Sequence, residues 1–239
     1  MYNVSIHNLS IGYGEKVVQR DLSFALEAGE MVCMLGRNGC GKSTLLRTLA
    51  GLQPSLGGSF EIADVAVVLT DRVSLENTSV REVVAMGRYP YTSFLGTLTK
   101  EDNRIIDEAM RDVGIGNRGR DTRVPGDGTS FNALSDGEKQ RVLIAKALAQ
   151  QTPVILLDEP TAHLDLPNRI LVLQLLRRLA HEQGKTILIS THELDLALRL
   201  SDRILLLSEN SAELETADHL KAKDAFTKAF GMDIFNIEL

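Results

Sequence analysis

The 239-residue chain contains no tryptophan, and only 5% of its residues are aromatic. It also lacks an excess of basic residues, because Asp and Glu number 32 against 26 for Lys and Arg, and the formal net charge is −6. Surfaces that bind nucleic acid need clustered lysine and arginine, with interleaved aromatic residues where single strands are bound. No such cluster occurs in the sequence. We therefore expect no nucleic-acid partner.

Long apolar runs and disulfide-forming cysteine patterns are also missing. No uninterrupted apolar segment approaches the ~20 residues that a membrane-spanning helix needs, and the N-terminus has no basic segment followed by an apolar one. We therefore expect a cytoplasmic protein. The only cysteines, Cys33 and Cys40, are predicted to be reduced thiols, and neither indicates a metal site.

One segment predicts a binding site for a polyphosphate. It fits the pattern G-x-x-x-x-G-K-[ST] and follows the apolar run 31–35, which indicates a buried strand. Its glycines let the backbone fold closely around an anion, and the helix that begins near Lys42 directs free N–H groups and its positive dipole end to the same place. Lys42 would reach the β- and γ-phosphates, and Ser43 would bind Mg²⁺ through its hydroxyl. The predicted nucleotide-binding residues are Gly36, Arg37, Asn38, Gly39, Cys40, Gly41, Lys42, Ser43 and Thr44.

The remaining pattern predicts an α/β fold with a mainly parallel sheet, an N-terminal antiparallel β subdomain and an inserted helical lobe. Residues 2–30 alternate short apolar runs with turn signals, which is typical of a small antiparallel sheet. Strand and helix patterns alternate over 154–207, which indicates a parallel sheet. Between these parts the pattern is helical, with a capping box at 99–102. We expect one domain over 1–239, with an α/β core of 1–71 and 151–239 and a helical lobe of 72–150.

Two strand ends carry side chains suited to nucleotide hydrolysis. Asp158 follows four apolar residues, as does the carboxylate that holds the magnesium shell in phosphate-loop NTPases. Glu159 beside it would orient or deprotonate the attacking water, because phosphoryl transfer depends mainly on positioning and charge stabilisation. His192 ends a neighbouring strand, where its imidazole would donate to a γ-phosphate oxygen. Tyr13 lies between two glycines, so its ring is either presented on a loop for stacking against a base or half-buried in a strand.

The segment 134–138, Leu-Ser-Asp-Gly-Glu, resembles the signature sequence LSGGQ of the ATP-binding cassette (ABC) family. Asp136 replaces the first glycine and Glu138 replaces the glutamine. With this signature the chain resembles an ABC ATPase subunit from about 5 to 202. The resemblance makes 36–43 the Walker A loop, 156–159 the Walker B strand with its catalytic glutamate, Tyr13 the adenine-stacking aromatic, 162–165 the D-loop and His192 the switch histidine.

The resemblance implies ATP and Mg²⁺ as ligands, and Glu159, His192 and Lys42 as catalytic residues. It also implies a head-to-tail dimer with a second ATPase subunit. In that dimer the residues Ser135 and Gly137 of one copy close over the ATP that Lys42 of the other copy holds.

Metal ligands in the resemblance are Ser43, Asp158 and a third residue from the end of the strand before the helical lobe. Members of the family usually place a glutamine there, and alignment on 80–82 puts Thr70 at this position. Thr70 is too short to reach the metal shell and the lobe at once, so we expect it to act through a bridging water. Asp71 next to it is the rival candidate.

The segment 80–90 resembles the VRELVxxGRxP stretch of ATPases that serve importers of ferric siderophores, haem and cobalamin. This resemblance implies a peripheral subunit on the inner face of the cell membrane, docked on an integral membrane permease and linked through it to a substrate-binding protein. Two alternatives remain open. One is an ABC ATPase for another solute or an exporter half. The other is a soluble ABC ATPase of DNA repair, translation or iron–sulfur assembly, although the coiled coils, zinc motifs or tandem cassettes typical of that class are not visible.

Overall fold

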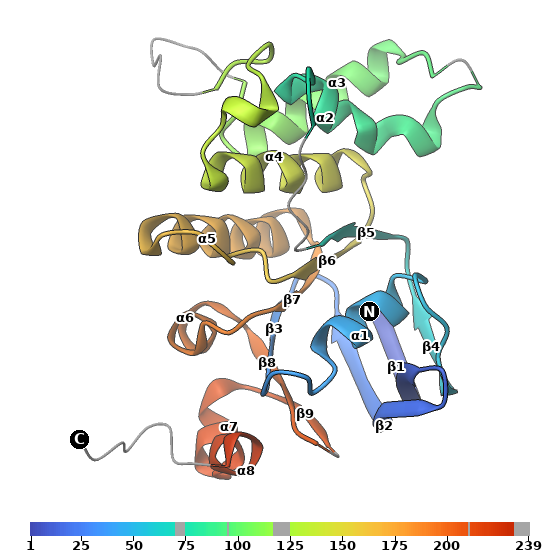
Figure 1. The fold of residues 1–239 in the computed structure, drawn as a ribbon, viewed down its shortest axis with the longest axis vertical. Coiled ribbons are helices and arrows are strands. Elements are labelled where there is room, and N and C mark those ends of the chain that lie inside the picture. Colours follow the sequence, from blue (N-terminus) through green and yellow to red (C-terminus); the bar gives the residue numbers. More distant parts are fainter. Residues whose placement is uncertain (70–74, 95, 117–124, 210, 232–239) are drawn as a thin grey trace. The chain divides into compact units, whose positions relative to one another are not determined.

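The computed structural model describes residues 1–69, 75–94, 96–116, 125–209 and 211–231 (Figure 1). The chain divides into two compact units. Unit 1 comprises Met1–Val67, Pro153–Pro160 and Leu176–Leu239, and unit 2 comprises Val68–Thr152 and Thr161–Leu175. Thr70 and Asp71, the two candidates for the third metal-site residue, lie outside the described residues.

An antiparallel sheet in unit 1 has the strand order β2-β1-β4 and confirms the predicted N-terminal β subdomain. Its strands are β1 (Tyr2–Tyr13), β2 (Lys16–Glu27) and β4 (Gly57–Ile62). The first two strands are longer than the short apolar runs suggest. The reason is that the pairing of β1 with β2 contains irregularities, one of them between Ile6 and Leu9, where Asn8 has a φ of 47°. Such bulges let a strand continue where the alternation of its sequence is interrupted.

The second sheet has six strands in the order β5-β6-β7-β3-β8-β9 and confirms the mainly parallel core. β3 pairs in parallel with β7 and β8, β6 pairs in parallel with β7, and β9 is antiparallel to β8. All positions of β3, β6 and β7 are buried, as is typical of strands covered on both faces. The bounds are β3 (Met31–Leu35), β5 (Val65–Val68), β6 (Val154–Asp158), β7 (Thr186–Ser190), β8 (Arg203–Leu207) and β9 (Ala212–Glu215).

Helix α1 (Lys42–Leu49) joins the cores of the two sheets, because it packs against both β1 and β6. Leu45, Leu46 and Leu49 are buried in a cluster formed with both sheets, and Gly51 with a φ of 70° follows the helix end. Docking these leucines fixes the position of the helix N-terminus. The other helices that lie in unit 1 are α6 (Leu194–Leu200), α7 (Ala217–Ala222) and α8 (Ala225–Phe230).

Unit 2 contains the inserted helical lobe, in which α2, α3 and α4 pack against one another (Figure 1). Its elements are α2 (Val80–Ala85), the short 3₁₀ helix η1 (Met86–Tyr91), α3 (Lys100–Asp112), η2 (Phe131–Ala133) and α4 (Asp136–Ala149). The capping box at Thr99 and Asp102 is confirmed. Helix α5 (Leu166–Gln183) begins in unit 2 and ends in unit 1. None of the helices in the described ranges combines the length and apolar composition that a bilayer-spanning helix requires.

The segment 80–90 has a packing role inside unit 2. A Cβ atom on Gly87 would lie 2.2 Å from the backbone oxygen of Lys146, so only glycine lets η1 lie directly against α4. Arg88 is buried beside it and donates to Asp102 Oδ1 (2.9 Å) and to the backbone oxygen of Ala149 (2.9 Å). Hydrogen bonds from Thr99 and from Arg88 lower the pKa of Asp102 to about 2, so this carboxylate stays charged. Gly87 and Arg88 therefore hold the lobe together.

Candidate functional site

The phosphate loop connects β3 to α1 in a conformation that requires glycine. Gly36, Gly39 and Gly41 have φ values of 154°, 80° and 103°. At Gly41 a Cβ atom would also lie 2.9 Å from the Val18 side chain, so both conformation and space exclude other residues. Gly41 is the N-cap of α1 and has no side chain with which to cap it, so the N–H groups of the first turn can receive an anion.

Lys42 lies over this loop and not in solvent. Its Nζ donates to the backbone oxygens of Gly36 (2.8 Å) and Arg37 (3.2 Å), and the residue is only 6% exposed. Arg37 and Asn38 at the apex are exposed. The backbone cradle, the ammonium group and the helix N-terminus therefore combine positive charge with free N–H donors, which fits a polyphosphate.

The thiol of Cys40 belongs to the same loop. Burial raises its pKa more than the neighbouring charge of Lys42 lowers it. Cys33 in β3 is fully buried, and burial raises its pKa to about 12. Both cysteines are free thiols, and they stay protonated at neutral pH.

A cluster of side-chain oxygens lies beside the loop at the carboxyl ends of β6 and β7. Ser43 Oγ donates to Asp158 Oδ1 at 3.0 Å, and Ser190 Oγ donates to the same oxygen at 2.6 Å. The parallel register places Asp158 opposite Ser190, which fixes this contact. Hydroxyl and carboxylate oxygens are the ligands that Mg²⁺ prefers, and this ion also keeps waters and substrate phosphates in its shell. Ser43 and Asp158 therefore fit a magnesium site.

Glu159 follows Asp158 in a constrained backbone conformation, with a φ of 47°. Its N–H donates to the backbone oxygen (3.2 Å) and to Oγ (2.9 Å) of Ser190, which holds the strained turn against β7. The side chain turns toward His192, whose Nε2 donates to Glu159 Oε1 at 2.6 Å. The Glu159 side chain is 30% exposed and that of His192 is 45% exposed, so water can reach both.

Tyr13 is the last residue of β1, where it pairs with Lys16 of β2. Tyr13 therefore ends a strand, but it is exposed and not half-buried, so neither of the two expected placements holds in full. The residue is 52% exposed, and its hydroxyl accepts a hydrogen bond from Thr44 Oγ1 at 3.0 Å. The hydroxyl is thus tied to the first turn of α1, while the residue stays exposed.

In unit 2 the signature segment forms the start of α4. Ser135 is the N-cap, and Glu138 Oε2 accepts hydrogen bonds from the Ser135 backbone N–H (2.9 Å) and hydroxyl (2.7 Å). Gly137 is buried, and a Cβ atom there would lie 2.7 Å from the side-chain amide of Asn168. Asp136 is exposed. The predicted pair Ser135 and Gly137 therefore lies at one helix N-terminus, with a carboxylate already bound to the serine.

Two residues at these sites were not predicted from the sequence. Ser190 links Asp158 to the Glu159 backbone, and the only sequence signal is a hydroxyl residue at the end of an apolar strand. Asn168 packs on Gly137 and donates through Nδ2 to Asp165 Oδ1 at 2.6 Å, which connects the D-loop to the signature segment. Sequence spacing gives no sign of the Gly137 contact, because the two residues belong to different helices.

Comparison with known proteins agrees with this geometry. The family model for ABC transporters matches residues 19–162. An uncharacterized ABC transporter ATP-binding protein of Methanocaldococcus jannaschii is 40% identical over 85% of this chain and 72% of its own length. The iron(3+)-hydroxamate import ATP-binding protein FhuC of Bacillus subtilis is 36% identical over 98% of this chain and 89% of its own length.

Solved structures show the same fold. One, described as a metal-chelate type ABC transporter in an inward-facing conformation, superposes with a TM-score of 0.86 at 30% identity and covers 97% of this chain and 90% of that one. Another is the dimeric post-hydrolysis state of an ATP-binding cassette with ADP and phosphate, with a TM-score of 0.72 at 25% identity, covering 90% and 98% of the two chains. The phosphate loop, the strand-end carboxylates and these relatives agree: the chain belongs to the ABC transporter family and is an ATP-binding subunit that hydrolyses ATP.

Proposed function

We propose that this chain, acting as one domain, energises an ABC importer for an iron chelate, haem or cobalamin. The observation that carries the hydrolytic part is the pair of Glu159 and His192, 2.6 Å apart, at the strand ends beside Asp158 and the phosphate loop. Relatives named as iron(3+)-hydroxamate import and cobalamin import ATP-binding proteins support the importer part.

In this proposal the phosphate loop and Tyr13 bind the nucleotide. The N–H groups of the loop and of the first turn of α1 hold the phosphates, and Lys42 moves from its loop carbonyls to the β- and γ-phosphates. Tyr13, kept in place by Thr44, stacks against adenine. Hydrogen bonds from Lys42 to the backbone oxygens of Gly36 and Arg37 help to hold the shape of the loop.

Ser43 and Asp158 would hold Mg²⁺, and its charge would stabilise the phosphate oxygens. Thr70 remains our candidate for a third, water-mediated contact. Glu159 accepts a proton from the attacking water, and the hydrogen bond from His192 fixes the direction of that carboxylate. Because the hydrogen bond to Ser190 fixes the Glu159 backbone, the Glu159 side chain extends from a fixed position in the site.

We further propose a head-to-tail dimer of two ATPase subunits. Ser135 and Gly137 of one copy would complete the phosphate site at Lys42 of the other. Each site would then be incomplete in a monomer, so that ATP drives closure of the dimer. The dimeric cassette with ADP and phosphate, which matches 90% of this chain, supports the formation of a dimer.

The subunit would dock on an integral membrane permease at the inner face of the membrane, and a substrate-binding protein would act through the permease. The packing role of Gly87 and Arg88 means that the segment 80–90 indicates the kind of lobe and not the solute itself. Co-purification from detergent-solubilised membranes tests the partner: a polytopic membrane protein should follow the tagged chain, and its absence would favour a soluble ABC ATPase.

Growth on single iron sources tests the solute. A strain that lacks this gene should fail to use at least one ferric chelate, haem or cobalamin, and the wild-type gene should restore growth. The Lys42→Ala gene is the matched control, because it should produce the subunit without nucleotide binding and should not restore growth. Unchanged use of every chelate, haem and cobalamin would contradict the solute class but not the ATPase activity.

A further inference from the structure

Gln19 is a buried polar residue behind the phosphate loop. It lies in β2, where it pairs with the fully buried Ile11, and only 1% of its surface is exposed. Burial of an amide is unfavourable unless hydrogen bonds in the protein replace those to water. An apolar residue could be buried at this position of β2 at a lower cost in free energy. Packing alone therefore does not explain a glutamine here.

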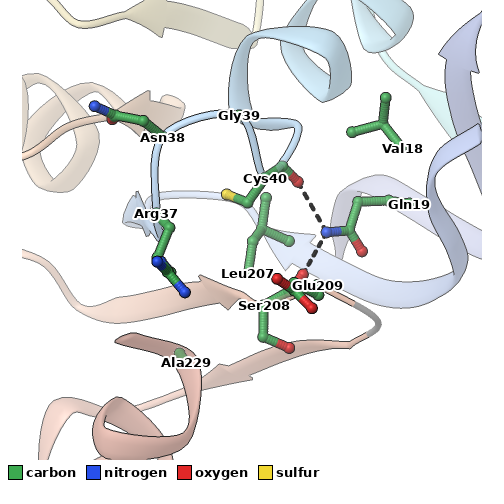
Figure 2. A pocket seen from close by; sticks show the side chains of 10 residues that line it. All are labelled: Val18, Gln19, Arg37, Asn38, Gly39, Cys40, Leu207, Ser208, Glu209 and Ala229. Carbon is green, nitrogen blue, oxygen red and sulfur yellow. Dashed lines mark hydrogen bonds between the residues drawn. The ribbon is translucent and has the colours of Figure 1, made fainter. Parts of the chain in front are cut away.

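Both donor hydrogens of the Gln19 amide are directed at backbone carbonyls. Nε2 donates to the oxygen of Cys40 at 2.8 Å and to the oxygen of Ser208 at 2.5 Å (Figure 2). Because both partners are acceptors, the orientation of the amide is determined by its surroundings. Ser208 directly follows β8, so one side chain connects the phosphate loop to the carboxyl end of that strand.

The amide oxygen of Gln19, Oε1, is buried and has no hydrogen-bond partner among the described residues. Gln19 lines a cavity of about 300 Å³ together with Arg37, Cys40 and Ser208 (Figure 2). A buried acceptor without a partner lowers stability. Since Nε2 makes two hydrogen bonds and Oε1 makes none, we favour a role of Gln19 in shaping the loop over a role in stabilising the fold.

The contact with Cys40 determines where the next N–H group points. A peptide unit is planar and trans, so its C=O and N–H point in opposite directions. When Gln19 draws the Cys40 oxygen toward β2, the N–H of Gly41 is directed to the opposite side of the peptide. That N–H belongs to the N-cap of α1, next to the N–H groups that receive an anion. Lys42 fixes the start of the loop in the same way through the oxygens of Gly36 and Arg37.

We infer that Gln19 is a positioning residue for nucleotide binding: it holds the Cys40–Gly41 peptide so that the Gly41 N–H faces the phosphates before they arrive. This inference rests on the proposed role of the phosphate loop. Gln19 touches no substrate itself. Its effect is preorganisation, which lowers the cost of binding and leaves the chemical step at Glu159 unchanged.

The test replaces Gln19 by methionine, which has a similar volume and no donor. The matched control is Asn3→Leu, which removes an amide that donates to Thr186 Oγ1 at 2.9 Å, away from the phosphate loop. Gln19→Met should raise the Kd for Mg-ATP, measured by calorimetry, and the KM about tenfold, because one preorganised hydrogen bond is lost. The kcat should stay within about twofold of wild type. Asn3→Leu should leave Kd and KM unchanged.

Thermal unfolding without nucleotide separates positioning from stability. Wild-type Kd and KM in Gln19→Met would overturn the inference, as would a change confined to the melting temperature in both variants. If Gln19→Met does not fold, Gln19→Asn carries the test, since it keeps an amide but is one methylene shorter and cannot reach both carbonyls. Wild-type affinity in that variant would also overturn the inference. Failure of the wild-type protein to bind Mg-ATP would instead contradict the proposed role of the loop itself.

Discussion

Glu159→Gln should stop ATP turnover while sparing ATP binding. Glutamine has the same shape, and its oxygen can still accept the hydrogen bond from His192 that Glu159 Oε1 accepts at 2.6 Å. The backbone N–H contacts with Ser190 do not involve the side chain, so the turn after β6 should persist. What glutamine cannot do is accept the proton of the attacking water.

The expected loss in kcat is on the order of 10²–10⁴-fold, the usual contribution of a general base. This loss corresponds to about 2.7–5.4 kcal/mol in the activation free energy. The Kd for Mg-ATP should stay within about twofold of wild type, because Lys42, Ser43 and Asp158 remain in place. With binding intact and hydrolysis blocked, ATP should hold the proposed dimer closed.

Phosphate release measures kcat, calorimetry measures Kd, and gel filtration with Mg-ATP measures dimer formation. Glu182→Gln is the control, because Glu182 is an exposed glutamate near the end of α5 and undergoes the same chemical change. Normal hydrolysis by Glu159→Gln would refute the assignment of the base. A variant that binds ATP and remains monomeric would refute the link between hydrolysis and dimer opening.

Two further predictions concern unit 2. Glu138→Gln should lower the ATP concentration for half-maximal dimer formation a few-fold, most clearly at low salt. The reason is that glutamine keeps the capping contact with Ser135 but removes a negative charge from the proposed γ-phosphate site. The control Glu101→Gln, in the first turn of α3, should have no effect, and equal behaviour of the two variants would argue against the site. Gly87→Ala should destabilise the protein by about 1–3 kcal/mol in denaturant unfolding, because its Cβ would lie 2.2 Å from the Lys146 backbone oxygen. Unchanged stability would mean that η1 can shift away from α4 without cost.

The sequence by itself determined the features that depend on residues a few positions apart. The phosphate loop follows from the spacing of its glycines and Lys42, since this pattern by itself predicts the glycine-dependent backbone conformation and the start of α1. The capping box at Thr99 and Asp102 was predictable for the same reason. The positions of Asp158 and His192 followed from the rule that parallel strands present their carboxyl ends at one edge of a sheet.

Only the tertiary structure decided how distant segments complete these local features. Gln19 and Ser208 are 189 positions apart, and Ser190 reaches Asp158 across 32 positions. Gly137 must be glycine because Asn168, from another helix, occupies the space of a Cβ atom. These contacts depend on strand register and helix packing, which are set by the burial of many apolar residues together. A polar residue such as Gln19 therefore carries no sign of its partner in the sequence, and its role becomes visible only once the fold has placed the Cys40 carbonyl beside it.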